Sequence, residues 1–160
     1  MALAVNETMR KFGYPACAIA EYRHWSVLLR PQQATLGALV LVCRGPETAF
    51  AAIGGDAFAE LDLAVGDIEL TLHQAFAYDK INYLMLMMVD PHVHFHVLPR
   101  YAGERDFGGL SFTDPGWPRL PDLAQSTTLD EVMFERLRDH IRLAWTKVPH
   151  RALAIGANPA

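Results

Sequence analysis

Three of the seven histidines in this 160-residue chain occupy every second position from residue 92 to residue 96. Apolar residues stand between and after them, in the order His-Val-His-Phe-His-Val-Leu. Such alternation is typical of a half-buried strand, because successive side chains of a strand point to opposite faces. The pattern predicts a strand that presents three imidazoles on its solvated face and packs Val93, Phe95 and Val97 into a core.

Three aligned imidazoles have more than one chemical interpretation. An imidazole can act as nucleophile, general base or hydrogen-bond donor near neutral pH, because its reference pKa is about 6.5. It is also a ligand for zinc and copper, and Asp90 could complete a set, but the outer two histidines of a straight strand lie about 13 Å apart. A third interpretation is a histidine-rich polar face without a chemical role. We favour catalysis and expect neither a metal nor another cofactor.

The run from His92 to Leu98 resembles the motif of the histidine triad (HIT) superfamily, in which three histidines alternate with apolar residues. The Pro99-Arg100 that follows is similar to the fragile-histidine-triad-like bacterial nucleotide hydrolases. The likeness spans roughly residues 25 to 100 and includes the apolar run that ends in Cys43. It implies hydrolysis or nucleotidyl transfer at an α-phosphate, and it implies a homodimer.

The resemblance also implies a role for each histidine. His94 is the implied nucleophile, which forms a covalent nucleotidyl intermediate that water then cleaves. His92 and His96 are implied to orient it, bind phosphate oxygens and assist the leaving group, with a carbonyl at His92 fixing the tautomer of His94. The implied substrate is a dinucleoside polyphosphate, a nucleoside phosphoramidate or an adenylylated compound. The alternative is a nucleotide-binding or scaffolding protein of this fold with little turnover.

Several positions depart from the family pattern. Ala38 stands where the family has a fourth histidine, and Arg30 stands where relatives carry Asn or Asp for the ribose hydroxyls. Met87 and Met88 occupy positions where Gly-Asn or Gln is common, whereas Asn82 agrees with a short-loop bacterial branch. The departures bear on ribose recognition, phosphate positioning and turnover, and they leave the nucleophile intact.

Four residues are predicted to bind substrate. Asn82 and Arg30 are included for their places in the pattern. Arg100 ends the triad strand, where its guanidinium can steady a phosphate or the following loop, or form a salt bridge. Trp117 lies in a long irregular segment, residues 101–125, and can stack on a base or anchor that segment to the core.

Hydrophobic periodicity predicts the elements that must position these residues. The expected helices are a short one at 4–12, a long one capped by Asp56 and ending near Phe76, and one that follows the capping-box residues Thr128 and Glu131. Strands are expected at 25–29 and 36–43, joined by a turn. A further strand at 80–89 is expected to form a tight hairpin with the triad strand. We therefore expect one α+β domain over residues 1–150, with an antiparallel sheet of about five strands, one long helix and a C-terminal helix. Residues 151–160 are expected to be a frayed tail, and the apolar stripe of the C-terminal helix would permit a homodimer.

Composition narrows the class of partner. The formal net charge is −4 and no basic run occurs, which argues against broad nucleic-acid binding. No run of about 18 apolar residues could span a membrane, and the apolar opening of the chain is too short for a signal peptide. Cys17 and Cys43 are isolated thiols, as expected in a reducing cytosol. We expect a cytoplasmic protein whose partners are a small nucleotide and a second copy of itself.

Overall fold

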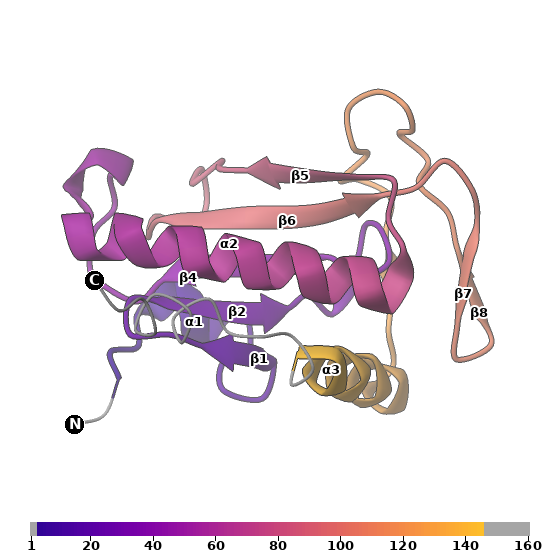
Figure 1. The fold of residues 1–160 in the computed structure, drawn as a ribbon, viewed down its shortest axis with the longest axis horizontal. Coiled ribbons are helices and arrows are strands. Elements are labelled where there is room, and N and C mark those ends of the chain that lie inside the picture. The colour runs from indigo at the N-terminus through magenta and orange to yellow at the C-terminus, as the bar shows by residue number, and fades with distance from the viewer. Residues whose placement is uncertain (1–2, 146–160) are drawn as a thin grey trace, which may run out of the picture.

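A computed structural model describes residues 3–145, and at its centre is a five-stranded antiparallel sheet (Figure 1). The strand order is β1-β2-β4-β6-β5, and these strands are β1 (Ala18–Glu21), β2 (Trp25–Leu29), β4 (Leu39–Cys43), β5 (Lys80–Leu84) and β6 (His94–Arg100). Two small sheets lie outside it, formed by β3 (Gln32–Gln33) with β9 (Thr127–Thr128) and by β7 (Arg105–Phe107) with β8 (Leu110–Phe112). The helices are α1 (Glu7–Lys11), the 3-10 turn η1 (Phe50–Ala52), α2 (Gly55–Phe76) and α3 (Glu131–Trp145). The predicted α+β class and five-stranded sheet are confirmed.

Both faces of the sheet are covered. The long helix α2 crosses one face with α3 beside its C-terminal end, and α1 lies behind the sheet in the same view (Figure 1). The α2 side holds the main core, and a second cluster under α1 contains Met9, Leu28, Val40 and Val42. This coverage explains why β4 is an uninterrupted apolar run, since a strand buried on both faces does not alternate.

The connection into the triad strand differs from the predicted tight hairpin. Strand β5 ends at Leu84 rather than at residue 89, and β6 begins only at His94. Residues 85–93 form the irregular connection, in which Met87 adopts a left-handed backbone with φ of 49°. Chain reversal therefore takes place before β6, and His92 lies in the connection rather than on the strand.

Other predicted boundaries also shift. The predicted strand at 36–43 begins at Leu39, because Gly37 turns at a φ of +86° against the ring of Phe76, where a Cβ would come within 2.9 Å. The N-cap of α2 is Gly54 and not Asp56, which lies in the first turn. Asp130 rather than Thr128 caps α3, since its carboxylate accepts a hydrogen bond from the Met133 N–H at 2.8 Å.

The C-terminal helix does not offer its apolar stripe to a partner. Its inward residues Leu137, Ile141 and Trp145 are buried within the same chain, against α2 and β1. The stripe is therefore part of the core of this chain, and a homodimer would have to use another surface. The predicted tail at 151–160 lies outside the described residues. Within the described part of the chain, no helix combines the length and apolar character needed to cross a bilayer.

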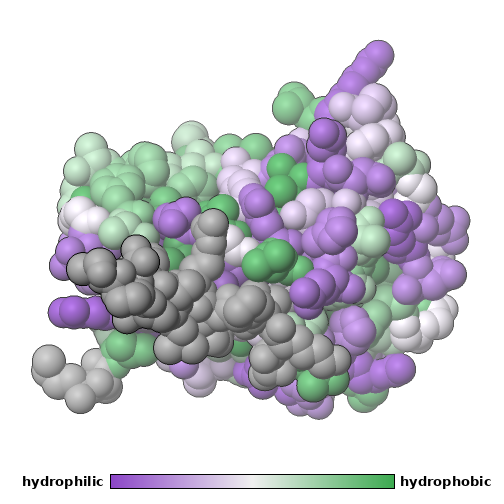
Figure 2. Space-filling model, in the orientation of Figure 1, coloured by the Kyte–Doolittle hydropathy of each residue, from purple (hydrophilic) through white to green (hydrophobic). Residues whose placement is uncertain are grey.

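Exposed apolar side chains gather at the end of the molecule where α2 begins and β5 ends (Figure 2). The exposed large apolar residues of these segments are Phe50, Phe58, Leu86, Met88 and Val89. Met88 is 87 % exposed, whereas Met87 packs against the main core.

Candidate active site

Strand β6 places two of the three histidines on one face of the sheet. His94 lies opposite Val42 of β4, and His96 lies between Val40 of β4 and Leu84 of β5. Residues two apart on a strand share a face, so both imidazoles are on the α1 side. His92 precedes the strand, and the prediction of three histidines on one straight strand therefore holds for two of them.

The ring of His94 is oriented by the main chain of its neighbour. Its Nδ1 lies 2.7 Å from the carbonyl oxygen of His92. A carbonyl only accepts, so Nδ1 carries the proton and the lone pair of the neutral ring is on Nε2. The carbonyl contact implied by the family resemblance is present, and Nε2 is the atom available for attack on an electrophile.

The ring of His96 is set in the opposite tautomer. Arg30 Nη1 lies 3.3 Å from its Nδ1, and because a guanidinium only donates, the ring proton is on Nε2. Burial, followed by the charges of Arg30 and His94, lowers the pKa of His96 to about 4, against a small opposing effect of Asp90. His96 is therefore neutral near pH 7 and presents an N–H donor.

The short helix α1 and its C-cap residue Phe12 contact the three histidines, which was not predicted. Thr8 Oγ1 lies 2.8 Å from Nδ1 of His92. The Phe12 ring centroid lies 5.5 Å from that of His94 and 6.2 Å from that of His96. The sequence carries no signal for these contacts, because they join residues far apart along the chain.

Helix α1 changes the exposure of the site. His94 is 1 % exposed, and His92 and His96 are half-buried. The expectation that the three rings face solvent is therefore wrong for His94, because α1 and Phe12 cover the face of the sheet on which it lies.

One of the four predicted substrate-binding residues is found at the triad. Arg30 contacts His96 as described above, and burial lowers its pKa from the usual value. No carboxylate in the described part of the chain forms an ion pair with it. A half-buried guanidinium without an acidic partner favours an anionic ligand.

The other three predicted residues lie together further along the sheet. Arg100, two strand repeats beyond His96, donates to both carboxylate oxygens of Asp114, to Asn82 Oδ1 and to the Arg119 carbonyl. This buried network holds the long segment after β6 onto the sheet. Trp117 and Asn82 line a cavity of about 720 Å³ next to the network, at the outer strand β5.

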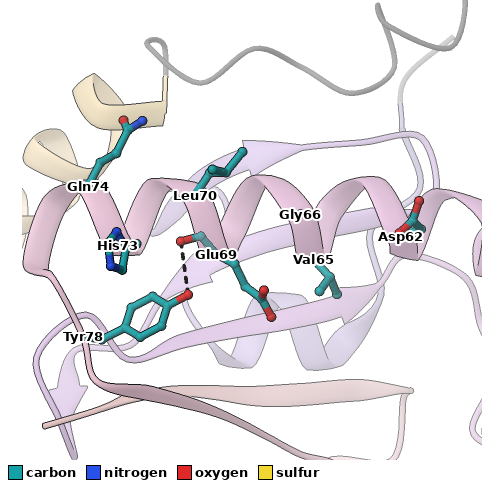
Figure 3. Close-up of a pocket in the computed structure, with 8 residues that line it drawn as sticks. All are labelled: Asp62, Val65, Gly66, Glu69, Leu70, His73, Gln74 and Tyr78. Atoms are coloured by element: carbon teal, nitrogen blue, oxygen red, sulfur yellow. Dashed lines mark hydrogen bonds between the residues drawn. The ribbon is translucent and has the colours of Figure 1, made fainter.

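A second cavity, of about 700 Å³, lies on the outer side of α2 and is drawn in Figure 3. Its residues include Glu69, His73 and Tyr78, and the Tyr78 hydroxyl donates to the main-chain carbonyl of Glu69 at 3.3 Å. The sheet separates α2 from the α1 side, so this cavity is not part of the histidine site. Among residues 3–145, no three His, Cys, Asp or Glu side chains are grouped so as to hold a metal ion.

No protein-family profile matches this chain, and no curated protein sequence matches it. Solved structures share its fold at low sequence identity. A histidine triad protein from Sinorhizobium meliloti aligns with a TM-score of 0.69 at 18 % identity, covering 89 % of this chain and 97 % of that chain. A histidine triad protein from Marinobacter aquaeolei gives a TM-score of 0.65 at 17 % identity, with 93 % and 100 % covered. A hypothetical histidine triad nucleotide-binding protein from Sulfolobus tokodaii aligns with a TM-score of 0.62 at 19 % identity, covering 81 % of this chain and 83 % of that chain. The chain therefore has the fold of the histidine triad superfamily, and its own three alternating histidines lie at the start of the inner strand β6 and directly before it.

Proposed function

We propose that the protein hydrolyses a nucleotide conjugate, or transfers its nucleotidyl group, by reaction at the α-phosphate with His94 as nucleophile. The observation that carries the proposal is the 2.7 Å contact between His94 Nδ1 and the His92 carbonyl, which leaves a lone pair on Nε2. The nucleotide-binding description of the Sulfolobus tokodaii neighbour supports the same class of ligand.

The reaction has two displacements at phosphorus. Nε2 of His94 attacks the α-phosphorus, a nitrogen–phosphorus bond forms, and the bond from phosphorus to the leaving group breaks with its electron pair. Water then attacks the same phosphorus, the bond to His94 breaks, and nucleoside monophosphate is released. The His92 carbonyl stabilises the positive charge that the ring of His94 carries in the intermediate.

The residues around the nucleophile are suited to binding a phosphoryl group. Neutral His96 offers an Nε2–H donor, and Arg30 supplies a positive charge without an acidic partner in the described structure. Donors aimed at developing negative charge are typically worth about 10²–10³-fold each in rate. Because His94 is 1 % exposed, substrate binding must also displace Phe12 from its ring.

A substrate panel tests the proposal. The purified protein is incubated with diadenosine tetraphosphate, adenosine 5′-phosphoramidate and an adenylylated amino acid, and release of adenosine monophosphate is followed. His94→Ala should abolish release and should also abolish the acid-labile adenylyl label on the protein. His73→Ala, a histidine change on the far side of α2, should leave both unchanged. Release by His94→Ala at the parent rate would overturn the assignment.

A second candidate is a nucleotide-binding protein with little turnover. Two observations favour it: the near-complete burial of His94, and Ala38 in place of the family's further histidine. Calorimetry with adenosine monophosphate separates the two candidates. Tight binding without hydrolysis of any member of the panel would support the second.

The expected homodimer also remains a proposal. The α3 stripe is buried, so a second copy would need another surface. Strand β5, at the outer edge of the sheet, is the strand nearest to the exposed apolar residues Leu86, Met88 and Val89. Sedimentation velocity of the parent and of Met88→Asp would measure the oligomeric state.

A further inference from the structure

Helix α1 places a hydroxyl group against the first histidine of the triad. Thr8 is 2 % exposed, and its Oγ1 lies 2.8 Å from Nδ1 of His92. The two residues are 84 positions apart in the chain. A hydrogen bond between such distant segments exists only if the helix is held in a defined place on the sheet.

Three contacts hold α1 in that place. The Asn6 side chain caps the helix through the Met9 N–H at 3.1 Å and donates to the carbonyls of Cys43 and Gly45 at 2.8 and 2.9 Å. Met9 is fully buried under the helix. A salt bridge of 2.6 Å joins Lys11 to Asp90 in the connection that leads to the triad.

His92 needs such a contact because the sheet does not orient it. His94 and His96 belong to the hydrogen-bonded ladder of β6, whereas His92 lies in the irregular connection before it. A free neutral imidazole rotates and exchanges its proton between the two nitrogens. One hydrogen bond to Nδ1 fixes both the ring plane and the tautomer.

We propose that Thr8 is a positioning residue for the reaction at His94, and that it acts by fixing the ring of His92 with the proton on Nε2. The Thr8 hydroxyl can either donate a hydrogen bond to Nδ1 of His92 or accept one from it, and the direction follows from what Nε2 of His92 must do. A lone pair on Nε2 would repel a phosphate, whereas an N–H would bind it, so the Thr8 hydroxyl donates to Nδ1. The inference rests on the proposed function and deepens it.

The same contact reaches the nucleophile by a second route. His92 supplies the carbonyl that holds Nδ1 of His94 at 2.7 Å. Release of the His92 side chain would free the residue that carries this carbonyl. Thr8 is therefore two hydrogen bonds away from the nucleophile, and it should affect the chemical step more than substrate affinity.

Three variants test the inference with the panel substrate that the parent cleaves fastest. Thr8→Val removes the hydroxyl and keeps the shape, and we expect kcat to fall 10- to 100-fold while KM stays within about 3-fold. Thr8→Ser keeps the hydroxyl and should retain most of the activity. Thr71→Val is the matched control, because Thr71 is fully buried in α2 and its hydroxyl has no partner among the described residues. It should leave kcat unchanged.

Nitrogen NMR of the histidine rings gives a readout that does not need turnover. The parent and Thr8→Ser should show His92 in one tautomer with the proton on Nε2, and Thr8→Val should show a mixture. If Thr8→Val does not fold, Thr8→Cys, a much weaker donor, replaces it.

The outcomes separate this inference from the proposed function. An active Thr8→Val with the kcat of the parent, or equal losses in Thr8→Val and Thr8→Ser, would overturn the role of Thr8 alone. An unchanged His92 tautomer in Thr8→Val would do the same. A parent that cleaves no member of the panel would overturn the proposed function, and the role of Thr8 in the reaction with it.

Discussion

The carbonyl oxygen of His92 lies 2.7 Å from Nδ1 of His94, while the ring of His92 bonds to Thr8. One residue thus uses its main chain to set the tautomer of its neighbour and its side chain to anchor to α1. This arrangement depends on His92 lying just outside β6, where its carbonyl is not used in the sheet ladder.

We expect the protein to lose stability as the pH falls from about 6.5 to about 4. Burial, Arg30 and His94 lower the pKa of His96 to about 4, whereas in the unfolded chain it is about 6.5. Between these values the unfolded state binds more protons, so the free energy of unfolding rises with pH. The change is on the order of 1–2 kcal/mol once solvent screening of the half-buried ring is allowed for. Urea denaturation at pH 4.5 and pH 7 measures it.

The control for this pH dependence is His96→Gln, which cannot titrate. The difference in unfolding free energy between the two pH values should be smaller in His96→Gln than in the parent. Equal differences in the two proteins would contradict the lowered pKa of His96.

Breaking the buried pair between Arg100 and Asp114 should be costly. The atoms Nε and Oδ2 lie 2.6 Å apart, and both side chains are almost fully buried. Asp114→Ala leaves an unpaired buried guanidinium and should lower the free energy of unfolding by about 3–5 kcal/mol. Adding Arg100→Met to that variant should restore part of the loss. Asp139→Asn, in an exposed ion pair, should cost less than about 1 kcal/mol in the same urea titration.

Removing the ring of Phe12 should expose the nucleophile. The Phe12 ring lies 5.5 Å from that of His94, which is 1 % exposed. Phe12→Ala should therefore raise the rate of His94 modification by diethyl pyrocarbonate several-fold, as mapped by mass spectrometry. Phe58→Ala, a change to an exposed ring on α2, serves as the control. A rate in Phe12→Ala equal to that of the parent would show that the ring does not limit access.

Asn6 should be less replaceable by Asp than by Ala. Its amide donates to two main-chain carbonyls, those of Cys43 and Gly45, while its oxygen caps α1. Asn6→Ala loses these hydrogen bonds, which should lower the free energy of unfolding by about 1–3 kcal/mol. Asn6→Asp keeps the helix cap but turns a carboxylate toward two carbonyl oxygens, which adds electrostatic repulsion and the cost of desolvating the carboxylate. Urea titration should rank the parent above Ala and Ala above Asp, and an Asp variant as stable as the parent would refute the assignment.

Much of the fold could be predicted from the sequence because its signals are local. The strand predicted at residues 25–29 is found at those residues, α2 begins and ends close to its predicted bounds, and α3 begins close to its predicted start. Periods of two and 3.6 residues report directly which side of a strand or helix is buried. The short strands β3, β7, β8 and β9 were missed, since two or three residues carry too little pattern.

The sequence by itself also determined the chemistry on offer: three histidines in alternation, an arginine at position 30 where relatives carry Asn or Asp, and a fold class. Only the tertiary structure decided which groups those side chains meet. It commits Arg100 to Asp114, places Arg30 beside His96, and covers His94 with α1. These outcomes could not be read from local patterns, because each contact joins residues whose separation along the chain gives no periodic signal. They arise only when packing of the sheet and helices brings distant segments together.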